Sequence, residues 1–244
     1  MLKFEVIPVT QFAQNCSLIW CDETRQAALV DPGGEADKLL AAIAKRGLTL
    51  THILLTHGHL DHVGAAAELR ERTGIAITGP HKEDAFWLDI LPQQSQMFGF
   101  AHTPAFTPDS WLEQGDKVQV GKCELEVYFC PGHTPGHIVL LCQAERLAWV
   151  GDVLFAGSIG RTDFPRGDHA TLIRAYAASQ RRVPLVLVGT GPEQDDCRAL
   201  AAELGVADRV IFAGFQPNPY PYIAHAGCMV LSSRFEGCPL VIGE

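Results

Sequence analysis

The chain has 244 residues, of which 47% are apolar and 19% charged, and this balance is typical of a folded domain and unlike that of a disordered chain. The formal charge of −9 is spread along the sequence, so we expect a small-molecule substrate and no nucleic acid. The start, MLKFEVIPVTQF, has no secretory pattern, and no run has the length of a bilayer span. We therefore expect a cytoplasmic protein without a membrane partner.

The first part of the chain alternates extended apolar segments with turns. LKFEVIPV, CSLIWC and AALVDPGG predict a meander of strands. EADKLLAAIAKRG has apolar residues at helical spacing and ends at Gly47, which predicts a helix with a glycine cap. The strand HILLT (52–56) comes next, and we expect one helix from Leu60 to about Arg72. The eight cysteines form no CxxC pair and predict buried thiols rather than disulfides.

The middle of the chain predicts a second group of strands. Residues 81–115 are polar, aromatic and proline-containing, as in a long loop or short helices over a site. KVQV, CELEVYF, HIVLLC and LAWVGDVL then read as strands. After about Ile173 the pattern changes to strand PLVLV, a glycine turn, a helix, strand VIFAGF, helix PYPYIAHAG and strand CMVLSS. This β-α-β order predicts a parallel sheet and a domain boundary near Arg174, between residues 1–173 and 174–244.

Residues 56–62, THGHLDH, hold three histidines and an aspartate directly after an apolar strand. Side chains two positions apart on a strand point the same way, so His57 and His59 are expected to face a common point. If a helix begins at Leu60, Asp61 and His62 face a neighbouring point. Imidazole and carboxylate ligands suit zinc, iron or manganese, so the cluster predicts one or two metal positions.

Two further candidates follow apolar strands, His133 in CPGHTPGH and Asp152 in WVGDVLF. Loops at one end of a sheet bring such residues together. Asp31 and Thr56 are candidates to orient the ligating imidazoles, although a turn residue and a strand-end hydroxyl are equally good readings. His137 is expected to be structural or to contact a ligand.

THGHLDH, CPGHTPGH, VGD and GRTDF occur in this order and closely resemble the metallo-β-lactamase superfamily, in particular its short glyoxalase II-like hydrolases, over residues 1–173. The resemblance implies an α/β fold, an αββα sandwich with a metal site at one edge. It implies a first site made by His57, His59 and His133, a second made by Asp61 and His62, and Asp152 as the bridging carboxylate. Asp61 and Asp152 are thereby the expected catalytic residues.

The resemblance also implies a reaction. In that family, metal ions activate water and polarise the carbonyl of a thioester such as S-lactoylglutathione, and zinc is the expected metal, with iron or manganese as alternatives. In GSIGRTDFP (157–165), Arg161 and Asp163 are expected near the substrate entrance, or else in a structural salt bridge. The C-terminal helical extension that longer glyoxalase II enzymes use for glutathione has no counterpart in this sequence.

One family feature is missing from the sequence. The family completes its second metal site with a histidine in a PGHG-like stretch beyond the GRTDF loop. After Asp152 the only histidines are His169 and His225, and neither follows a strand and a turn. We therefore expect a sandwich without its last elements, a weaker second metal site and impaired activity.

Residues 174–244 resemble a different family, the nucleotide-binding domain of retaining GT-B glycosyltransferases. The resemblance depends on the turn Gly189-Thr190-Gly191-Pro192 and on Glu236 and Glu244, which are spaced as E-x7-E behind SSRFEG. It implies that Glu236 lies near the donor sugar phosphate, that amides from Gly237 onward face the pyrophosphate, and that Glu244 contacts the ribose. The acceptor-binding domain is missing, so the expected role of this Rossmann-like fragment is structural.

Three alternatives to the hydrolase remain open at this stage. The first is a mononuclear-iron persulfide dioxygenase, a relative in the same superfamily that needs only His57, His133 and Asp152. The second is a nucleotide-sugar-binding glycosyltransferase fragment. The third is an inert chimera of two families.

Overall fold

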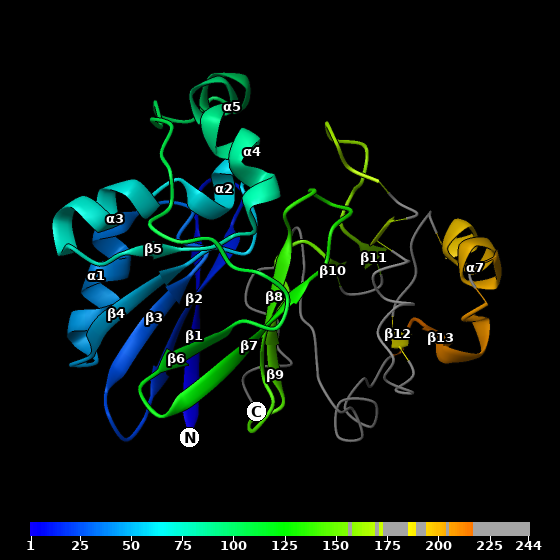
Figure 1. Cartoon of the computed structure of the whole chain (residues 1–244), viewed down its shortest axis with the longest axis horizontal. Coiled ribbons are helices and arrows are strands. Elements are labelled where there is room, and N and C mark those ends of the chain that lie inside the picture. The colour runs from blue at the N-terminus through cyan, green and yellow to red at the C-terminus, as the bar shows by residue number, and fades with distance from the viewer. Residues whose placement is uncertain (156–157, 169–170, 173–184, 189–193, 204, 217–244) are drawn as a thin grey trace.

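Two β-sheets lie face to face in the computed structural model, which describes residues 1–155, 158–168, 171–172, 185–188, 194–203 and 205–216 (Figure 1). The core between the sheets consists of apolar side chains from both. Leu54 and Ile19 of the first sheet and Leu125 and Leu140 of the second are fully buried in it. This packing of two half-apolar sheets confirms the mixed α/β fold expected from the sequence.

The first sheet has five strands in the order β1-β2-β3-β4-β5. Their bounds are β1 Leu2–Val9, β2 Gln14–Cys21, β3 Gln26–Val30, β4 Thr49–Leu54 and β5 Ile77–Thr78. The first three strands are antiparallel, and β3, β4 and β5 are parallel to one another. The predicted meander is therefore confirmed, while β4 begins at Thr49 rather than at His52.

The second sheet has four antiparallel strands in the order β6-β7-β8-β9. Their bounds are β6 Lys117–Val120, β7 Cys123–Phe129, β8 Ile138–Cys142 and β9 Leu147–Trp149. In β6 the exposed Lys117 and Gln119 alternate with the buried Val118 and Val120. This period of two is the reason that the short segment KVQV forms a strand with one face in the core.

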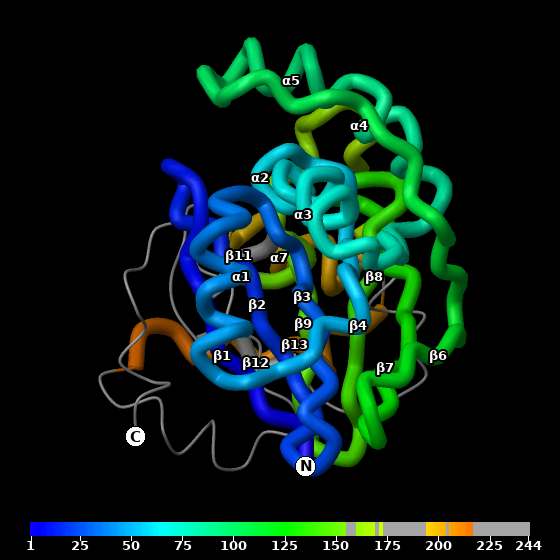
Figure 2. Tube along the Cα trace, turned by 90° about the vertical axis from the view of Figure 1, so that its left-hand side faces the viewer, coloured from blue at the N-terminus to red at the C-terminus, as the bar shows by residue number. Residues whose placement is uncertain are grey.

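Helices cover the outer face of the first sheet. Helix α1 (Ala36–Lys45) and helix α3 (Ala66–Thr73) lie against it, and Figure 2 looks onto this face with both helices in front of the strands. Leu39 and Leu69 of these helices are fully buried in a second core with Leu29 and Ile53 of the strands. The chain segment that connects β5 to the second sheet contains η1 (Lys82–Asp84), α4 (Ala85–Asp89) and α5 (Leu91–Phe98).

The single helix predicted from Leu60 to Arg72 is wrong, because the structure has two helices, α2 (Leu60–Val63) and α3. The helices separate where the Pro32–Gly33 segment passes. The backbone N–H of Ala65 donates to the carbonyl of Pro32 at 2.9 Å instead of continuing the helix. A Cβ on Gly64 would lie 2.4 Å from the carbonyl oxygen of Gly33, so the close approach needs glycine.

The described part of the C-terminal region contains short elements. Strands β10 (Leu154–Phe155) and β11 (Ser158–Ile159) form a hairpin, and β12 (Leu185–Val188) pairs in parallel with β13 (Val210–Gly214) through α7 (Gln194–Glu203) and η2 (Ala207–Arg209). The first β-α-β unit predicted there is thus confirmed. Cys197 of α7 packs against the small cluster of Val153 and Leu172.

Other predictions for this region fall on residues outside those described. They concern the helix PYPYIAHAG, the strand CMVLSS and the boundary near Arg174, which stays a prediction. Among the described residues, no helix combines the length and the apolar character that crossing a membrane requires.

Candidate metal centre

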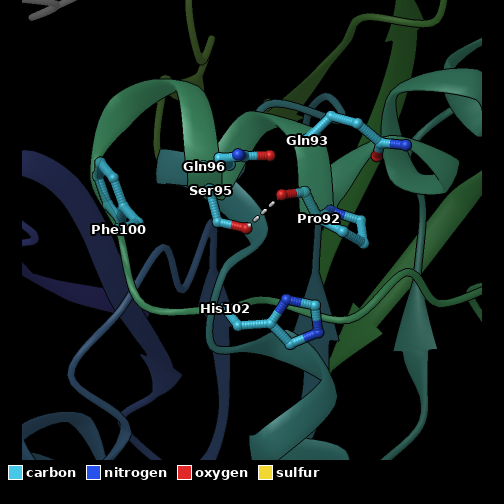
Figure 3. A pocket seen from close by; sticks show the side chains of 6 residues that line it. All are labelled: Pro92, Gln93, Ser95, Gln96, Phe100 and His102. Atoms are coloured by element: carbon cyan, nitrogen blue, oxygen red, sulfur yellow. Dashed lines mark hydrogen bonds between the residues drawn. The ribbon is translucent and has the colours of Figure 1, made fainter.

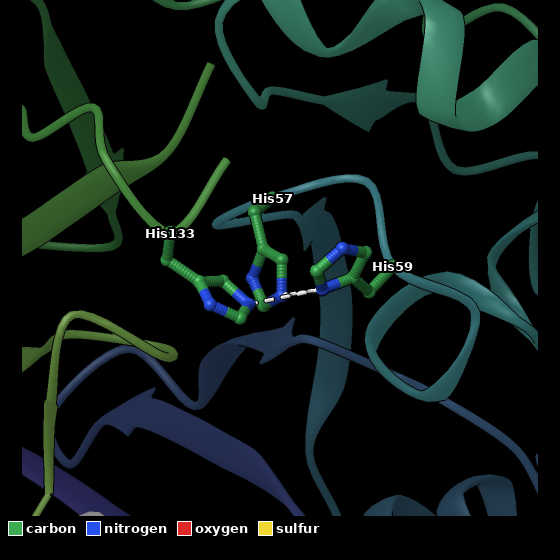
Figure 4. A group of neighbouring side chains, drawn as sticks. All are labelled: His57, His59 and His133. Carbon is green, nitrogen blue, oxygen red and sulfur yellow. Dashed lines mark hydrogen bonds between the residues drawn. The ribbon is translucent and has the colours of Figure 1, made fainter. Parts of the chain in front are cut away.

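Three loops converge on one edge of the sandwich. The loop after β4 carries Thr56, His57 and His59, the loop after β7 carries His133, and the loop after β9 carries Asp152. Figure 4 shows the imidazoles of His57, His59 and His133 pointing toward one another from two of these loops. The structure therefore brings together residues that are up to 95 positions apart, from His57 to Asp152.

The first group of side chains has three converging nitrogens. Nδ1 of His59 lies 3.1 Å from Nε2 of His57 and 3.0 Å from Nε2 of His133. The three nitrogens lie within 4.8 Å of one another, and all three residues are buried. Three imidazole nitrogens facing one point are the donor set of a zinc or iron site.

The neighbours of His57 show which of its nitrogens carries the proton. Both oxygens of the Asp31 carboxylate accept from Thr56, Oδ1 from the backbone N–H and Oδ2 from the hydroxyl, each at 2.7 Å. The Thr56 hydroxyl has then used its proton, so it accepts from Nδ1 of His57 at 3.1 Å. Nε2 of His57 is left with a free lone pair that faces the other two imidazoles, as a metal ligand requires.

The same reasoning applies to His133. Its Nδ1 lies 2.6 Å from the backbone carbonyl oxygen of Arg161, which can only accept a hydrogen bond. Nδ1 therefore carries the proton and Nε2 has the lone pair. The loop after β11 thus fixes the ring of a candidate ligand from behind.

The second group consists of Asp61, His62 and Asp152. Nε2 of His62 lies 3.2 Å from Oδ1 of Asp152 and 3.8 Å from Oδ2 of Asp61, while its Nδ1 donates to Asp31 at 3.0 Å. The other oxygen of Asp152 lies 3.4 Å from Nε2 of His133. The Asp152 carboxylate thus has one oxygen near His62 and the other near His133 of the first group.

Asp31, His57 and His62 form a third set of possible donors, whose ligand atoms also lie within 4.8 Å of one another. Asp31 already accepts hydrogen bonds from Thr56 and His62 on its two oxygens. We therefore assign Asp31 the role of orienting these imidazoles rather than that of a ligand, which is one of the two readings that the sequence left open.

The family model of the Metallo-beta-lactamase superfamily matches residues 9–191 of this chain. The chain belongs to the metallo-beta-lactamase superfamily. The match covers the strands β2 to β9 and all of the side chains of the two donor groups. Within this superfamily, the histidine and aspartate donors fit a metal cofactor, because imidazole nitrogens and carboxylate oxygens face common points.

Individual superfamily members are similar to this chain over most of their length. The hydroxyacylglutathione hydrolase GloC of Haemophilus influenzae is 51% identical over 173 residues, which are 70% of this chain and 81% of that protein. The structure of the B3 metallo-beta-lactamase BLEG-1 has a TM-score of 0.66 and 33% identity, covering 73% of this chain and 85% of its own. The protein TTHA1623, solved in a di-iron-bound form, has a TM-score of 0.64 and 32% identity, covering 70% and 83%.

A second family model, that of glycosyl transferases group 1, matches residues 151–244. This match overlaps the metallo-beta-lactamase match over residues 151–191 and continues to Glu244. The second resemblance seen in the sequence is therefore also found by this comparison. Residues Glu236, Gly237 and Glu244 lie outside the described part of the structure.

The electrostatics of the first donor group suit neutral imidazoles. Burial lowers the pKa of His57 and that of His59 well below the ordinary value, and the neighbouring histidines lower both further. An imidazole must be neutral to offer its lone pair to a cation. The metallo-beta-lactamase fold therefore holds these ligands in the protonation state that metal binding needs.

The second donor group behaves differently. Burial lowers the pKa of His62, but the carboxylates of Asp152 and Asp61 outweigh it, and the net result is a pKa well above the ordinary value. Burial raises the pKa of Asp152, but the imidazole of His62 outweighs it and lowers the pKa. For Asp61, burial is the largest influence, and it raises the pKa of this carboxyl. The carboxylates therefore draw a positive charge to this position, supplied by a proton or by a metal ion.

Asp84 is a part of the site that the sequence reasoning missed. Its buried carboxylate accepts from Gly58 N–H at 2.8 Å, from the Thr134 hydroxyl at 2.8 Å and from Gly136 N–H at 2.5 Å. It thereby ties the His57–His59 loop to the His133 loop. In the sequence, Asp84 is one acidic residue in the polar segment HKED, and no local pattern distinguishes it.

Aromatic rings enclose the first donor group. The ring centroid of His59 lies 4.5 Å from that of Trp87 and 4.9 Å from that of Phe164, both at edge-to-face angles. His137 stacks on His57 with centroids 4.5 Å apart, and its Nε2 accepts from the backbone N–H of Asp152 at 3.0 Å. His137 thus contacts the ring of one candidate ligand and the backbone of another, which is one of the two roles that the sequence left open for it.

The remaining predicted site residues have separate places. Arg161 and Asp163 form a two-point ion pair at 2.6 Å and are exposed, and the Arg161 guanidinium lies 4.3 Å from the ring centroid of Phe164. They are therefore beside the site, while their part in substrate binding remains a proposal. His169 and His225 lie outside the described residues.

A separate hollow lies at α5, lined by Pro92, Gln93, Ser95, Gln96, Phe100 and His102 (Figure 3). None of these six residues belongs to either donor group. The Ser95 hydroxyl inside it donates to the backbone carbonyls of Leu91 and Pro92, so its proton is used in hydrogen bonds within α5. The hollow contributes no reactive group to the metal centre.

Proposed function

We propose that this chain is a metal-dependent hydrolase of glyoxalase II type, which cleaves the thioester of an acylglutathione such as S-lactoylglutathione. The observation that carries the proposal is the position of Asp152, whose two oxygens lie 3.4 Å from His133 and 3.2 Å from His62. One carboxylate thereby joins two groups of metal donors. The 51% identity to a protein named hydroxyacylglutathione hydrolase supports the choice of substrate class.

The metal, when bound, supplies a water made nucleophilic at neutral pH and positive charge for the developing oxyanion. The side chains of the two donor groups would hold the metal. His57, His59 and His133 would hold the first ion, and Asp61 and His62 the second, with Asp152 shared between them. Asp61 is the more exposed carboxylate of the pair, with 28% of its side chain accessible against 23% for Asp152. Both carboxylates are therefore partly accessible to solvent.

We propose zinc as the metal, with iron or manganese as alternatives, because three neutral imidazoles and carboxylates suit all three ions. The di-iron-bound relative supports iron as a serious alternative. The second position is proposed to bind more weakly, since Asp61, His62 and Asp152 are its assigned ligands and the histidine that the family usually adds is missing from the sequence after Asp152.

The decisive test is thioester hydrolysis by the full chain after reconstitution with zinc, manganese or ferrous iron. The loss of the thioester absorbance of S-lactoylglutathione would be followed for the wild type, for His59→Ala and for His102→Ala. His102 is an exposed histidine of the hollow and serves as the matched control. We expect hydrolysis by the wild type and the control but not by His59→Ala. Equal loss of thioester with and without the protein contradicts the proposal.

A second candidate is a mononuclear-iron persulfide dioxygenase, which needs only His57, His133 and Asp152. The 3.4 Å separation of His133 and Asp152 is compatible with it, since these two side chains lie together without a contribution from Asp61 or His62. Oxygen consumption on glutathione persulfide by the iron-loaded chain would support it. Thioester cleavage by the zinc-loaded chain, without oxygen uptake, would rule it out.

For residues 174–244 we propose a structural role, with a boundary near Arg174. The packing of Cys197 against Val153 and Leu172 supports this, because α7 adds apolar cover to a cluster of the preceding domain. A nucleotide-sugar site formed by Glu236, Gly237 and Glu244 is the alternative. Calorimetric titration of the full chain with UDP- and GDP-sugars separates the two, and measurable binding that Glu236→Gln abolishes would contradict the purely structural role.

A further inference from the structure

His59 differs from the other two imidazoles of the first donor group in how its ring is held. Nδ1 of His57 donates to the hydroxyl of Thr56. Nδ1 of His133 donates to the carbonyl of Arg161. His59 instead turns Nδ1 toward the other two imidazoles, and its buried Nε2 has no hydrogen-bond partner within the described part of the chain (Figure 4). A ligating histidine usually has such a partner, so another contact has to orient this ring.

The missing partner matters most when a cation is bound. If Nδ1 of His59 gives its lone pair to a cation, the proton of the neutral ring is on Nε2. The residue is only 7% exposed, so this N–H is largely shielded from water. A buried N–H without an acceptor is unfavourable, and the face of an aromatic ring is a weak acceptor that takes its place.

Two aromatic rings lie against His59. The ring centroid of Trp87 is 4.5 Å away at an interplanar angle of 81°, and that of Phe164 is 4.9 Å away at 63°. Edge-to-face contacts of this kind bring the positive edge of one ring to the negative face of the other. The indole N–H of Trp87 is also buried without a hydrogen-bond partner among the described residues. The two rings therefore hold the imidazole by packing rather than by a hydrogen bond.

The backbone on both sides of His59 is fixed to Trp87. Before the histidine, a Cβ on Gly58 would lie 2.7 Å from the Cβ of Trp87, so the close approach needs glycine. After the histidine, the N–H of Leu60 donates to Oε1 of Gln94 at 3.0 Å. Nε2 of the same buried amide donates to the carbonyl of Trp87 at 2.8 Å. The indole therefore has a fixed place beside the imidazole.

Phe164 is fixed to the metal centre from the other side. Its ring centroid lies 5.9 Å from that of His133 as well as 4.9 Å from that of His59. Both ends of its loop are tied to the His133 loop. The carbonyl of Arg161 accepts from Nδ1 of His133, and the N–H of Asp168 donates to the carbonyl of Gly132 at 2.8 Å. The half-buried Phe164 ring is thereby held over two candidate ligands.

We propose that Trp87 and Phe164 are positioning residues, which hold the imidazole of His59 as a metal ligand in place of a hydrogen-bond partner. This role rests on the metal centre of the proposed hydrolase and not on its substrate. Without the two rings, the His59 side chain gains rotational freedom, and Nδ1 leaves the point that the other two imidazoles face. The first donor group then offers a cation two fixed nitrogens instead of three.

The test measures the zinc affinity of the full chain by competition with a chelator of known affinity. Trp87→Leu and Phe164→Leu remove one ring each and keep an apolar side chain. We expect each to lower the affinity by roughly 10–100-fold, the range seen when other partners of ligating histidines are removed. Trp87→Phe keeps an aromatic ring and is expected to retain most of the wild-type affinity. A loss in Trp87→Phe as large as that in Trp87→Leu would contradict a role of the aromatic ring.

The chain offers a matched control for each ring. Trp20 also has a buried indole N–H without a partner among the described residues, but its ring contacts the guanidinium of Arg46. Phe4 is partly exposed and makes an edge-to-face contact with Trp149, with centroids 6.4 Å apart. Trp20→Leu and Phe4→Leu are expected to keep the wild-type zinc affinity. An equal loss of affinity in these controls would show a general effect of stability and would overturn the proposal.

Cobalt(II) gives a second readout, which a change in stability alone does not move. The visible absorption of the bound ion depends on the number and geometry of its ligands. Trp87→Leu and Phe164→Leu are expected to change this spectrum, and Trp87→Phe and the two controls to keep it. A wild type that binds neither zinc nor cobalt overturns the proposed metal centre together with this role. A wild type that binds them, with unchanged affinity and spectrum in both leucine variants, overturns this role alone.

Discussion

His133 donates the proton on Nδ1 to the backbone carbonyl of Arg161 across 2.6 Å. The loop that follows β11 therefore supports a metal ligand through its main chain and leaves the Arg161 side chain free for another role. That side chain pairs with Asp163 at 2.6 Å and is exposed.

Arg161→Ala therefore separates metal binding from substrate binding. We expect full metal content and a change of less than about 1 kcal/mol in the free energy of unfolding, since an exposed ion pair contributes little. The KM for S-lactoylglutathione is expected to rise roughly tenfold, because the variant loses the proposed charge-assisted contact between the guanidinium and a carboxylate of the substrate. Metal analysis and steady-state kinetics check this, and loss of the metal would show that the side chain itself supports the centre.

Thr56→Val tests the hydroxyl that links Asp31 to His57. The substitution keeps the shape of the side chain but removes the acceptor for Nδ1 of His57, so the ring loses its fixed orientation. We expect metal affinity to fall by roughly 10–100-fold, as for other partners of ligating histidines. Thr51→Val is the control, because the Thr51 hydroxyl donates to Ala27 away from the site. Competition with a chelator of known affinity measures both variants, and equal affinities contradict the assigned role.

The number of tightly bound ions follows from the two donor groups. We expect about one ion per chain to survive extensive dialysis, held by His57, His59 and His133. His62→Ala is expected to retain that ion, and His59→Ala to lose it, by elemental analysis of the dialysed proteins. A chelator is expected to lower the Tm of the wild type, because metal that binds only the folded state stabilises it. Two ions that both resist dialysis would contradict the weak second site.

Asp84 gives a pH dependence with a defined sign. Burial raises the pKa of its carboxyl to about 6 in the folded chain. Between pH of about 4 and 6, the unfolded chain releases this proton while the folded chain keeps it, so the free energy of unfolding falls as the pH rises. The contribution of Asp84 to the free energy of unfolding is fully present below the pKa that its carboxyl has in the unfolded chain. It is lost above about pH 6, and its upper limit is about 3 kcal/mol.

Asp84→Asn removes this titration. Urea unfolding of metal-free protein at pH values from about 4 to 7 is expected to show a steeper decline for the wild type than for the variant. Asp116→Asn is the control, since the Asp116 side chain is exposed and accepts from the backbone N–H of the nearby Glu113. Parallel pH profiles for wild type and Asp84→Asn would contradict the raised pKa. The variant is also expected to hold metal less tightly, because Asp84 ties both ligand loops together.

Much of the fold follows from local patterns in the sequence. Lys117–Val120 and Cys123–Phe129 form strands with the predicted bounds, because alternating polar and apolar side chains fit a sheet with one buried face. His57 and His59 face one point as predicted, with nitrogens 3.1 Å apart, although they lie in the loop after β4 and not on the strand itself. These features depend on neighbours in the chain, so the sequence is sufficient to predict them.

Other features depend on segments that are distant in the sequence. The break between α2 and α3 is caused by the backbone of Pro32 and Gly33, which no helical pattern near Gly64 reveals. Asp84 is important because Gly58 and Gly136 donate to it from two loops. By itself the sequence indicated which residues are candidate metal ligands and which segments of the chain carry them. Only the tertiary structure decided which ring nitrogens face the other imidazoles and which carboxylate links the loops, since both depend on contacts between distant backbone and side-chain groups.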